Sequence, residues 1–398
     1  MKIYQINVVC GSGSTGRIVV DLAQIIEFQG DKCRIAYGRG IAPDDVDSYR
    51  IGGNCSVYWH ALLTRLTGRH GLYSRVATKR LINDIREYNP DIIHLHNLHG
   101  YYLNYEILFR YLRESGKPVV WTMHDCWAFT GHCAHYESVD CEKWQSGCDE
   151  SCINLLSYPI SRTAKNVKGN FERKKREFSQ VDNLTIVTPS LWLAEQVKNS
   201  FLKGKMVTTI PNGIDLCRFS PKKSDIKKQM GIEKKHLVLG VASVWTEKKG
   251  LNDFFELSQI LDDTYAVCLV GLSRKQIAEL PKRVIGIAKT SSIEELSRFY
   301  SSADVFVNLT YEDTFPTTNI EALACGTPVI TYRTGGSPEI IETSCGGVVE
   351  KGDFAAIKYL IENMCERNNM VNSCVKRASE FNKNESYRQY LSLYREVL

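Results

Sequence analysis

Short apolar runs alternate with longer amphipathic stretches along the whole chain. In the first half, five runs rich in β-branched residues predict strands at 3–9, 33–37, 91–96, 118–123 and 185–188. Four more runs follow in the second half, at 237–242, 266–270, 304–307 and 328–331. Strands that alternate with helical stretches are typical of βα units on a parallel sheet. The pattern therefore predicts an α/β protein with two doubly wound, Rossmann-like domains.

The segments between the two halves predict where the domains meet. Thr188-Pro189-Ser190 predicts the start of a helix, and residues 207–210 predict one more strand. We therefore expect the hinge at residues 189–205. The last stretch, from residue 381 on, has helical periodicity. Its expected apolar face consists of Tyr387, Tyr390, Leu391, Tyr394 and Leu398. The expected domains are residues 1–188 together with 381–398, and residues 189–380.

Composition places the chain among ordinary globular proteins. Its 398 residues are 43% hydrophobic and 24% charged, which suits two or three folded domains. The net charge of +5 is too small to indicate nucleic-acid binding. No apolar run approaches the roughly 20 residues that span a bilayer, and the first ten residues are too short for a secretory signal. We expect a cytoplasmic protein.

Fourteen cysteines are scattered along the chain, with one cluster. The cluster consists of Cys133, Cys141, Cys148 and Cys152. Four thiolates can hold a structural zinc ion, and the last pair has ordinary ligand spacing. Reduced thiols and a local disulfide are the alternatives.

A glycine-rich segment, Gly11-Ser12-Gly13-Ser14-Thr15-Gly16, follows the first predicted strand. Its G-x-G-x-x-G pattern is typical of dinucleotide-binding units, which carry an acidic residue about 20 positions later. Here the second strand ends in Tyr37-Gly38-Arg39, which suits only a phosphorylated ribose. An NADP-dependent oxidoreductase is therefore one candidate. The others are a phosphate or sugar at the helix start and a tight turn without a ligand.

A second cluster of chemical interest lies at residues 311–331. A loop with Glu312 and Asp313 follows a predicted strand, and a helix is predicted to begin near Pro316 and to end before Gly326. Backbone N–H groups of residues 315–318 would then point toward the ligand edge of the sheet. Asp313 and Glu321, eight positions apart, could hold two ends of an elongated polar ligand.

Two further segments come to the same edge of the sheet. Lys248-Lys249-Gly250 follows the 237–242 strand, and Gly335–Glu339 follows the 328–331 strand. They add a cation and another helix start. Because a point cation and helix dipoles both favour concentrated negative charge, the expected ligand is a diphosphate.

These motifs resemble those of family 4 retaining glycosyltransferases, which have the GT-B architecture. Pro211–Asp215, with Phe219 and Pro221, resembles the family's signature at the start of the second domain. Residues 313–321, with Ala324–Pro328, resemble its donor-site helix. His124-Asp125, with Trp121, Trp127 and Gly131, resembles enzymes that assemble capsular or exopolysaccharides, including colanic-acid-type enzymes. The resemblance covers the whole chain and implies two facing domains with a cleft between them, an acceptor-side N-terminal domain and a donor-binding C-terminal domain.

The resemblance also implies a reaction and its residues. A sugar would pass from a nucleotide-diphosphate donor to a glycan or lipid-linked hydroxyl, with retention and with no metal or cofactor required. Lys249 would neutralise the diphosphate, Asp313 would bind the transferred sugar, and His124 would contact that sugar. The implied donor-binding residues are Ser14, Thr15, Gly16, Arg17, Ser243, Lys248, Phe315, Pro316, Thr317, Thr318 and Glu321.

The sequence departs from the family pattern at two positions. Asp313 stands where the family usually has glutamate, and Glu312 lies beside it. Ser243 stands six residues before Lys249, where the family commonly has arginine. The diphosphate charge would then fall to Lys249, Lys248 and helix dipoles, or to Arg17.

One surface segment indicates a membrane. Residues 51–83 hold five basic side chains and no acidic ones, beside Tyr58, Trp59 and three leucines. A second basic run follows at 165–176. Basic amphipathic segments bind anionic lipid headgroups, which would place the protein on the inner face of the cell membrane, near a lipid-linked acceptor. An ordinary solvated helix face is the alternative.

Three functions compete with the sugar transferase. A nucleotide-sugar epimerase or hydrolase would use the same fold without a second substrate. A catalytically silent nucleotide-sugar-binding subunit would bind the donor without turnover. The NADP-dependent oxidoreductase would use the glycine-rich segment instead.

Overall fold

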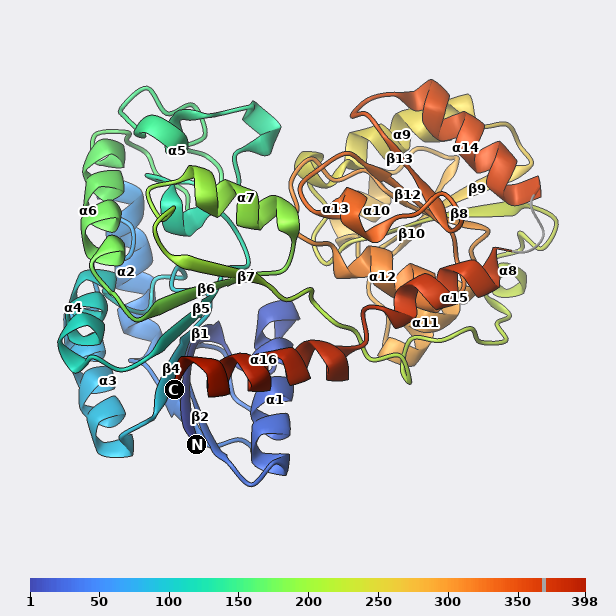
Figure 1. Cartoon of the computed structure of the whole chain (residues 1–398). Helices are drawn as coiled ribbons and strands as arrows, with labels where there is room; N and C mark the ends of the chain where they lie inside the picture. Colours follow the sequence, from blue (N-terminus) through green and yellow to red (C-terminus); the bar gives the residue numbers. More distant parts are fainter. Residues whose placement is uncertain (367–369) are drawn as a thin grey trace. The chain divides into compact units, whose positions relative to one another are not determined.

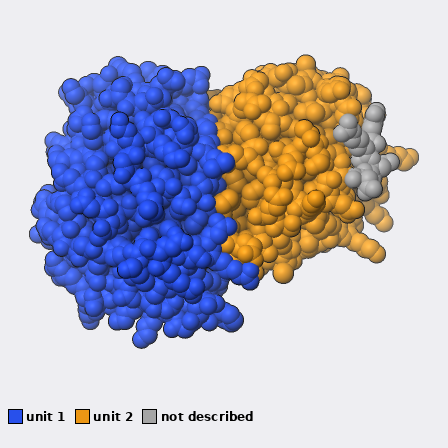
Figure 2. Space-filling view, viewed as in Figure 1, with its two compact units in different colours: residues 1–210, 387–398 blue, residues 211–386 orange. Residues whose placement is uncertain are grey.

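The computed structural model describes residues 1–366 and 370–398 and divides the chain into two compact units. Unit 1 comprises Met1–Ile210 and Tyr387–Leu398, and unit 2 comprises Pro211–Ser386 (Figures 1 and 2). A seven-stranded parallel sheet forms the centre of unit 1, and a six-stranded parallel sheet forms the centre of unit 2. The predicted α/β class with two Rossmann-like domains is confirmed.

The sheet of unit 1 has the strand order β3-β2-β1-β4-β5-β6-β7. Its strands are β1 (Lys2–Val9), β2 (Lys32–Arg39), β3 (Ser48–Arg50), β4 (Ile92–Leu95), β5 (Val119–Thr122), β6 (Leu184–Thr188) and β7 (Met206–Thr209). All five strands predicted in the first half are present, and so is the one predicted at 207–210. β3 was not predicted, because three residues at a sheet edge carry too little periodic pattern.

Helices cover both faces of this sheet (Figure 1). The helices of this unit are α1 (Gly13–Phe28), α2 (Asn54–Thr67), α3 (Arg75–Tyr88), α4 (Tyr105–Ser115), α5 (Lys143–Ser146), α6 (Val167–Ser179), α7 (Leu191–Asn199) and, from Tyr387 on, α16 (Lys383–Val397), with short 3₁₀ turns η1 (Trp127–Phe129) and η2 (Glu137–Val139). One core packs α3, α4 and part of α6 and α7 on the sheet, and a second core packs α1 and α16 on it. The predicted apolar face of α16 is buried, except that Leu398 is exposed because it follows the end of the helix.

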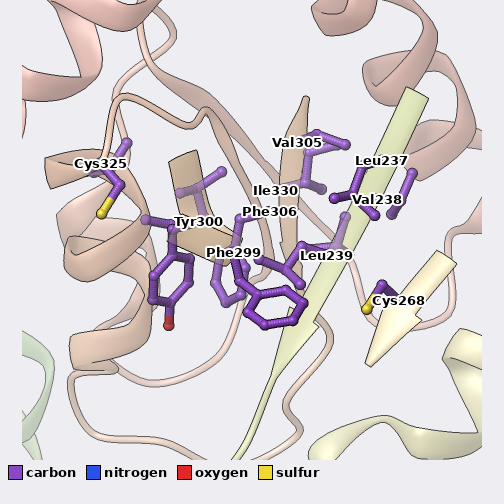
Figure 3. Close-up of a cluster of buried hydrophobic side chains, with 14 of the residues drawn as sticks. Leu237, Val238, Leu239, Cys268, Phe299, Tyr300, Val305, Phe306, Cys325 and Ile330 are labelled. Carbon is purple, nitrogen blue, oxygen red and sulfur yellow. The ribbon is translucent and has the colours of Figure 1, made fainter. Parts of the chain in front are cut away.

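The sheet of unit 2 has the strand order β10-β9-β8-β11-β12-β13. Its strands are β8 (His236–Val241), β9 (Tyr265–Val270), β10 (Val284–Ile287), β11 (Val305–Asn308), β12 (Val329–Tyr332) and β13 (Gly346–Val349). Its helices are α8 (Ile226–Gln229), η3 (Glu247–Lys249), α9 (Leu251–Ile260), α10 (Arg274–Ala278), α11 (Ile293–Ser302), α12 (Thr317–Ala324), α13 (Ser337–Ile340), α14 (Phe354–Glu366) and α15 (Val371–Ser379). Figure 3 shows part of the core, where β8, β9 and β11 meet Phe299 and Tyr300 of α11.

The division of the chain lies later than the sequence predicts. Residues 189–210 belong to unit 1, because β7 pairs in parallel with β6. Residues 381–386 belong to unit 2, where Ile214 forms a bridge with Asn382. The expected hinge at 189–205 is therefore corrected, since that segment contains α7, and the division falls between Ile210 and Pro211.

An exposed apolar surface lies on unit 1. Tyr58, Trp59, Leu62 and Leu66 of α2 are exposed, and Trp59 is 63% exposed. A second apolar segment, with Ile153, Leu156 and Ile160 exposed, precedes Arg162, whose N–H donates to the Arg65 carbonyl at 2.9 Å. In the parts of the chain that the structure describes, no helix is long and apolar enough to cross a membrane.

Candidate active site

Two loops of unit 2 meet at the carboxyl ends of its central strands. β8 and β11 are parallel neighbours, so the loops that follow them leave the same edge of the sheet. Lys248 Nζ donates to Glu312 Oε1 at 2.7 Å, and Lys249 Nζ donates to Asp313 Oδ2 at 2.9 Å. Two adjacent ion pairs thus join the two loops. All four of these residues were singled out in the sequence, and they lie together.

Gly250 explains how the lysines come so close to the second loop. Its φ of +74° lies in the left-handed region, and a Cβ there would stand 2.3 Å from the Leu309 carbonyl oxygen. Any other residue would push the two loops apart. The Lys-Lys-Gly motif therefore combines two cations with the glycine that positions them.

The start of α12 lies directly behind Asp313. Pro316 is the residue before the first helical turn and gives no side-chain cap, so the N–H groups of Thr317 and Thr318 stand at the positive end of the helix dipole. The Phe315 N–H donates to Asp313 Oδ1 at 3.3 Å. Asp313 is thereby held by both Lys249 and the backbone. Gly326 follows the helix with a φ of +84°, as the sequence predicts.

Glu321 is a buried residue of α12 and not a solvated surface glutamate. The Tyr300 hydroxyl donates to Glu321 Oε2 at 3.0 Å. Burial, together with the charge of Glu321, raises the pKa of Tyr300 well above its ordinary value, so this tyrosine stays a hydrogen-bond donor. The carboxylate of Glu321 is fixed in orientation one turn inside the helix.

The other positions of unit 2 that the sequence singles out lie in neighbouring loops. Ser243 is exposed in the loop after β8, ahead of the two lysines. The segment after β12 reaches the start of α12, because the Gly336 N–H donates to the Thr314 carbonyl at 3.2 Å. The loops that follow β8, β11 and β12 therefore lie together, as the sequence predicts.

In unit 1 the glycine-rich segment forms the predicted strand-to-helix turn. Gly11 and Gly13 have φ values of +75° and +67°, and the Gly11 N–H donates to the Gly16 carbonyl at 2.9 Å. Ser14 and Arg17 are exposed in the first turn of α1, whereas Thr15 is half-buried. This turn and the residues that follow β5 lie at the same edge of the sheet of unit 1.

His124 and Asp125 follow β5 and are each held by a histidine that follows β4. His124 Nε2 lies 3.2 Å from His96 Nδ1, and Asp125 Oδ2 lies 2.5 Å from His99 Nε2. Burial lowers the pKa of His124 to about 4, so the ring is neutral at pH 7. Burial would raise the pKa of Asp125, but the charge and hydrogen bond of His99 outweigh it and lower that pKa to about 2.

Comparison with known families decides among the candidate functions. The family model described as Glycosyltransferase Family 4 matches residues 15–218, and the model described as Glycosyl transferases group 1 matches residues 222–381. The chain belongs to glycosyltransferase family 4. It is therefore a glycosyltransferase, and the oxidoreductase function suggested by the glycine-rich segment is set aside.

Two relatives illustrate the range of this glycosyltransferase family. A protein of Escherichia coli K12 named as a colanic acid biosynthesis glycosyl transferase, WcaC, is 25% identical over 384 residues, 90% of either chain. A Campylobacter jejuni protein, named N,N'-diacetylbacillosaminyl-diphospho-undecaprenol alpha-1,3-N-acetylgalactosaminyltransferase, is 30% identical over 224 residues, 52% of this chain and 58% of the relative.

Solved structures show that the fold is shared. Sucrose-phosphate synthase from Thermosynechococcus elongatus has a TM-score of 0.73 at 18% identity, covering 100% of this chain and 98% of that one. Anabaena Alr3699/HepE in complex with UDP has a TM-score of 0.67 at 15% identity and covers 100% of both chains. These likenesses support the GT-B fold of the glycosyltransferase.

The sequence did not reveal the buried polar residues that support the side chains of the candidate site. Gln5 and Tyr300 were not singled out, and His96 was interpreted only as part of a strand that leads to the site, although each is buried and hydrogen-bonded to a neighbouring polar side chain. A usable signal was present, because Gln5 and His94 stand among the apolar residues of β1 and β4, and His96 follows β4 directly. Polar side chains in a buried strand must find partners.

Neither the cysteine cluster nor Asp45-Val46-Asp47, a D-x-D sequence in a loop of unit 1, forms a metal site among the described residues. Within residues 1–366 and 370–398, no group of three or more His, Cys, Asp or Glu side chains is arranged to hold a metal ion. Cys133 is buried among apolar residues, while Cys141, Cys148 and Cys152 are half-buried. Asp47 of Asp45-Val46-Asp47 pairs with Arg34 at 3.0 Å.

Proposed function

We propose that this glycosyltransferase moves a sugar from a nucleoside-diphosphate donor to a glycan or lipid-linked hydroxyl, with retention and without a catalytic metal, in surface polysaccharide synthesis. The relative named for colanic acid biosynthesis supports the pathway class. The relative whose name describes transfer to a diphospho-undecaprenol sugar supports a lipid-linked acceptor. The HepE structures in complex with UDP and with UDP-glucose support the donor class.

The observation that carries this proposal is the Lys249–Asp313 pair beside the start of α12. An ammonium group and the positive end of a helix dipole are suited to a diphosphate. Asp313 would release Lys249 to the phosphates and accept hydrogen bonds from hydroxyls of the transferred sugar. Glu321, fixed by Tyr300, would accept from the ribose hydroxyls.

The chemical step follows from where charge develops. As the bond between C1 of the sugar and the phosphate oxygen breaks, negative charge grows on that oxygen, and Lys249 stabilises it. The acceptor hydroxyl forms the new bond to C1 on the face that the phosphate leaves, which retains the configuration. Its proton passes to the departing phosphate oxygen, so no protein base or metal is required.

Other residues would complete the binding of the donor. In unit 2 these are Ser243, Lys248 and the backbone of Phe315, Pro316, Thr317 and Thr318. In unit 1, Ser14, Thr15, Gly16 and Arg17 would contact the phosphates, and His124 would contact the transferred sugar. Ser243 stands where the family commonly has an arginine. Lys248 and Arg17 would therefore share the charge of the diphosphate with Lys249.

A ligand panel followed by product analysis tests this function. The purified chain is heated with UDP-, GDP-, dTDP- and ADP-sugars and with NADP, because a specific ligand raises the midpoint of unfolding by mass action. We expect a shift with one nucleotide sugar, transfer to an acceptor in the presence of EDTA, and the donor's anomeric configuration in the product by NMR. A shift with NADP alone, or free sugar as the sole product, would contradict the proposal.

We further propose that the acceptor is met at the inner face of the cell membrane, through α2 and the exposed segment at 153–160. Apolar side chains stand beside Arg65, Arg69 and Arg162 there, which suits an anionic lipid surface. The protein would then be cytoplasmic and peripherally bound.

A further inference from the structure

A row of buried polar side chains lies on the face of the sheet of unit 1 that α1 and α16 cover. Gln5 of β1 is paired in register with His94 of β4, and His96 follows that strand. All three side chains are fully buried. His96 Nε2 lies 3.1 Å from Gln5 Oε1, and His96 Nδ1 lies 3.2 Å from His124 Nε2. A continuous hydrogen-bonded chain thus runs from Gln5 to His124.

The amide orientation of Gln5 fixes which atoms donate and which accept along this row of hydrogen bonds. The amide nitrogen Nε2 donates to the Val19 carbonyl at 2.9 Å and to Cys33 Sγ at 3.2 Å. A flipped amide would set its oxygen against the Val19 carbonyl, which is repulsive. Gln5 Oε1 therefore faces His96 as an acceptor, and His96 Nε2 must carry a proton.

His96 then determines the state of the next ring. Burial, with His94 and His124 adjoining, lowers the pKa of His96 well below its ordinary value, so its ring is neutral. A neutral ring protonated at Nε2 has a lone pair at Nδ1. His124 Nε2 faces that lone pair and must donate to it.

We propose that Gln5 and His96 are positioning residues that hold His124 as its Nε2–H tautomer, so that His124 Nδ1 is a hydrogen-bond acceptor toward the transferred sugar. The statement about the sugar rests on the proposed function, whereas the tautomer does not. His124 is half-buried and stays at the ligand edge of the sheet.

The tautomer restricts which sugars suit the site. A group that meets Nδ1 has to donate a hydrogen bond, which a hydroxyl does. A carboxylate oxygen would face a lone pair and be repelled. The donor sugar therefore presents a hydrogen-bond donor, a hydroxyl or an acetamido N–H, and not a carboxylate, at the position that meets His124.

The tautomer is tested on the whole chain without any substrate. In protein labelled with ¹⁵N-histidine, long-range ¹H–¹⁵N correlation spectra distinguish a protonated ring nitrogen from one with a lone pair. The His124 signals are assigned by their loss in His124→Gln. We expect the proton on Nε2 in the wild-type chain. A proton on Nδ1 overturns the proposal, whatever reaction the enzyme catalyses.

Kinetics with the donor that the ligand panel identifies test the positioning role. His96→Phe removes the acceptor for His124 and is expected to lower kcat/KM about tenfold, the effect of one hydrogen bond, chiefly by raising KM. His96→Asn restores an acceptor oxygen near the place of Nδ1 and should recover most of the loss. Gln5→Leu removes the acceptor that keeps the proton of His96 on Nε2. The NMR signals of His124 should therefore shift in this variant.

His94→Phe is the matched control. His94 is equally buried, two residues before His96 and within β4, but its two ring nitrogens bond to the Tyr394 hydroxyl at 2.6 Å and to Thr122 Oγ1 at 2.8 Å, not to His124. Its loss should lower stability and leave kcat/KM of the folded enzyme within about threefold. An equal loss in His94→Phe, or a His96→Asn variant no better than His96→Phe, would overturn the positioning role.

Discussion

Lys248 and Lys249 are adjacent and carry the same charge, but they pair with different carboxylates. Lys248 pairs with Glu312, whose side chain is 9% exposed, so this pair ties the loops together. Lys249 pairs with Asp313, and both side chains are more open to solvent. A ligand anion can therefore exchange places with Asp313 more readily than with Glu312. The catalytic cation is expected to be Lys249.

Alanine substitution separates the two lysines. We expect Lys249→Ala to lower kcat by about 10²–10³, since it removes the cation that stabilises the departing phosphate. Lys248→Ala should instead lower the midpoint of thermal unfolding and change kcat by less than about tenfold. Steady-state kinetics and thermal melts of both variants check this. Small and equal effects on kcat and KM in Lys249→Ala would refute its catalytic role.

At this scale, motifs with fixed spacing could be predicted and contacts across the fold could not. Asp313, Glu321 and Lys249 were found because turn and helix signals surround them. The contact between Gln5 and His96 was not found, because 91 positions separate the two residues and the pairing of β1 with β4 brings them together. No local pattern records that pairing.

At the scale of elements, the family signature at Pro211–Asp215 has a structural explanation. The Ile214 N–H donates to the Phe381 carbonyl at 2.9 Å, and the Lys383 N–H donates to the Ile214 carbonyl at 3.0 Å. A Cβ on Gly213 would stand 2.3 Å from Lys383 Cα. The glycine is therefore needed for the backbone before α8 to lie against the start of α16.

Gly213→Ala is expected to destabilise unit 2 by about 1–3 kcal/mol, because backbone has to move to make room for the methyl group. Gly204→Ala is the control, since a Cβ there meets nothing within 4 Å. Urea unfolding of both variants measures the difference. Equal midpoints for the two would show that the approach at Gly213 is not tight.

The predicted strands were confirmed where apolar runs were long, and the missed strands were short or rich in glycine. β10 has four residues, and β13 begins with Gly346-Gly347. Such strands are specified by the neighbours they pair with and not by their own side chains. The late division of the chain has the same origin, because β7 belongs to unit 1 through its pairing with β6.

The exposed face of α2 leads to a prediction about membranes. We expect the chain to sediment with vesicles that contain anionic lipid, and less so as salt is raised. The double variant Trp59→Ser and Leu62→Ser should lose most of this binding, because it removes the apolar side chains that would enter the lipid. Tyr359→Ser, at a residue of α14 that is equally exposed, is the control. Unchanged binding by the α2 variant would refute the membrane face.

At the scale of the whole molecule, the histidines are divided unequally. Eight of nine lie in unit 1, and His236 alone lies in unit 2. Burial lowers the pKa of His60 and His94 to about 3 and that of His124 and His132 to about 4. The unfolded chain titrates near pH 6.5, so below that pH it binds more protons than the folded chain does.

Acid should therefore weaken unit 1 before unit 2. Below pH 6.5 each of these buried histidines lowers the free energy of unfolding by about 1.4 kcal/mol per pH unit, until its folded pKa is reached. Hydrogen exchange at pH 7.5 and 5.5, corrected for the intrinsic rate, should show faster opening in residues 1–210 and 387–398 and little change in 211–366. Exchange that rises equally in both units would show that the acid response does not come from these histidines. The segment 387–398 is a sensitive reporter, since Tyr394 bonds directly to His94 and should open together with β4.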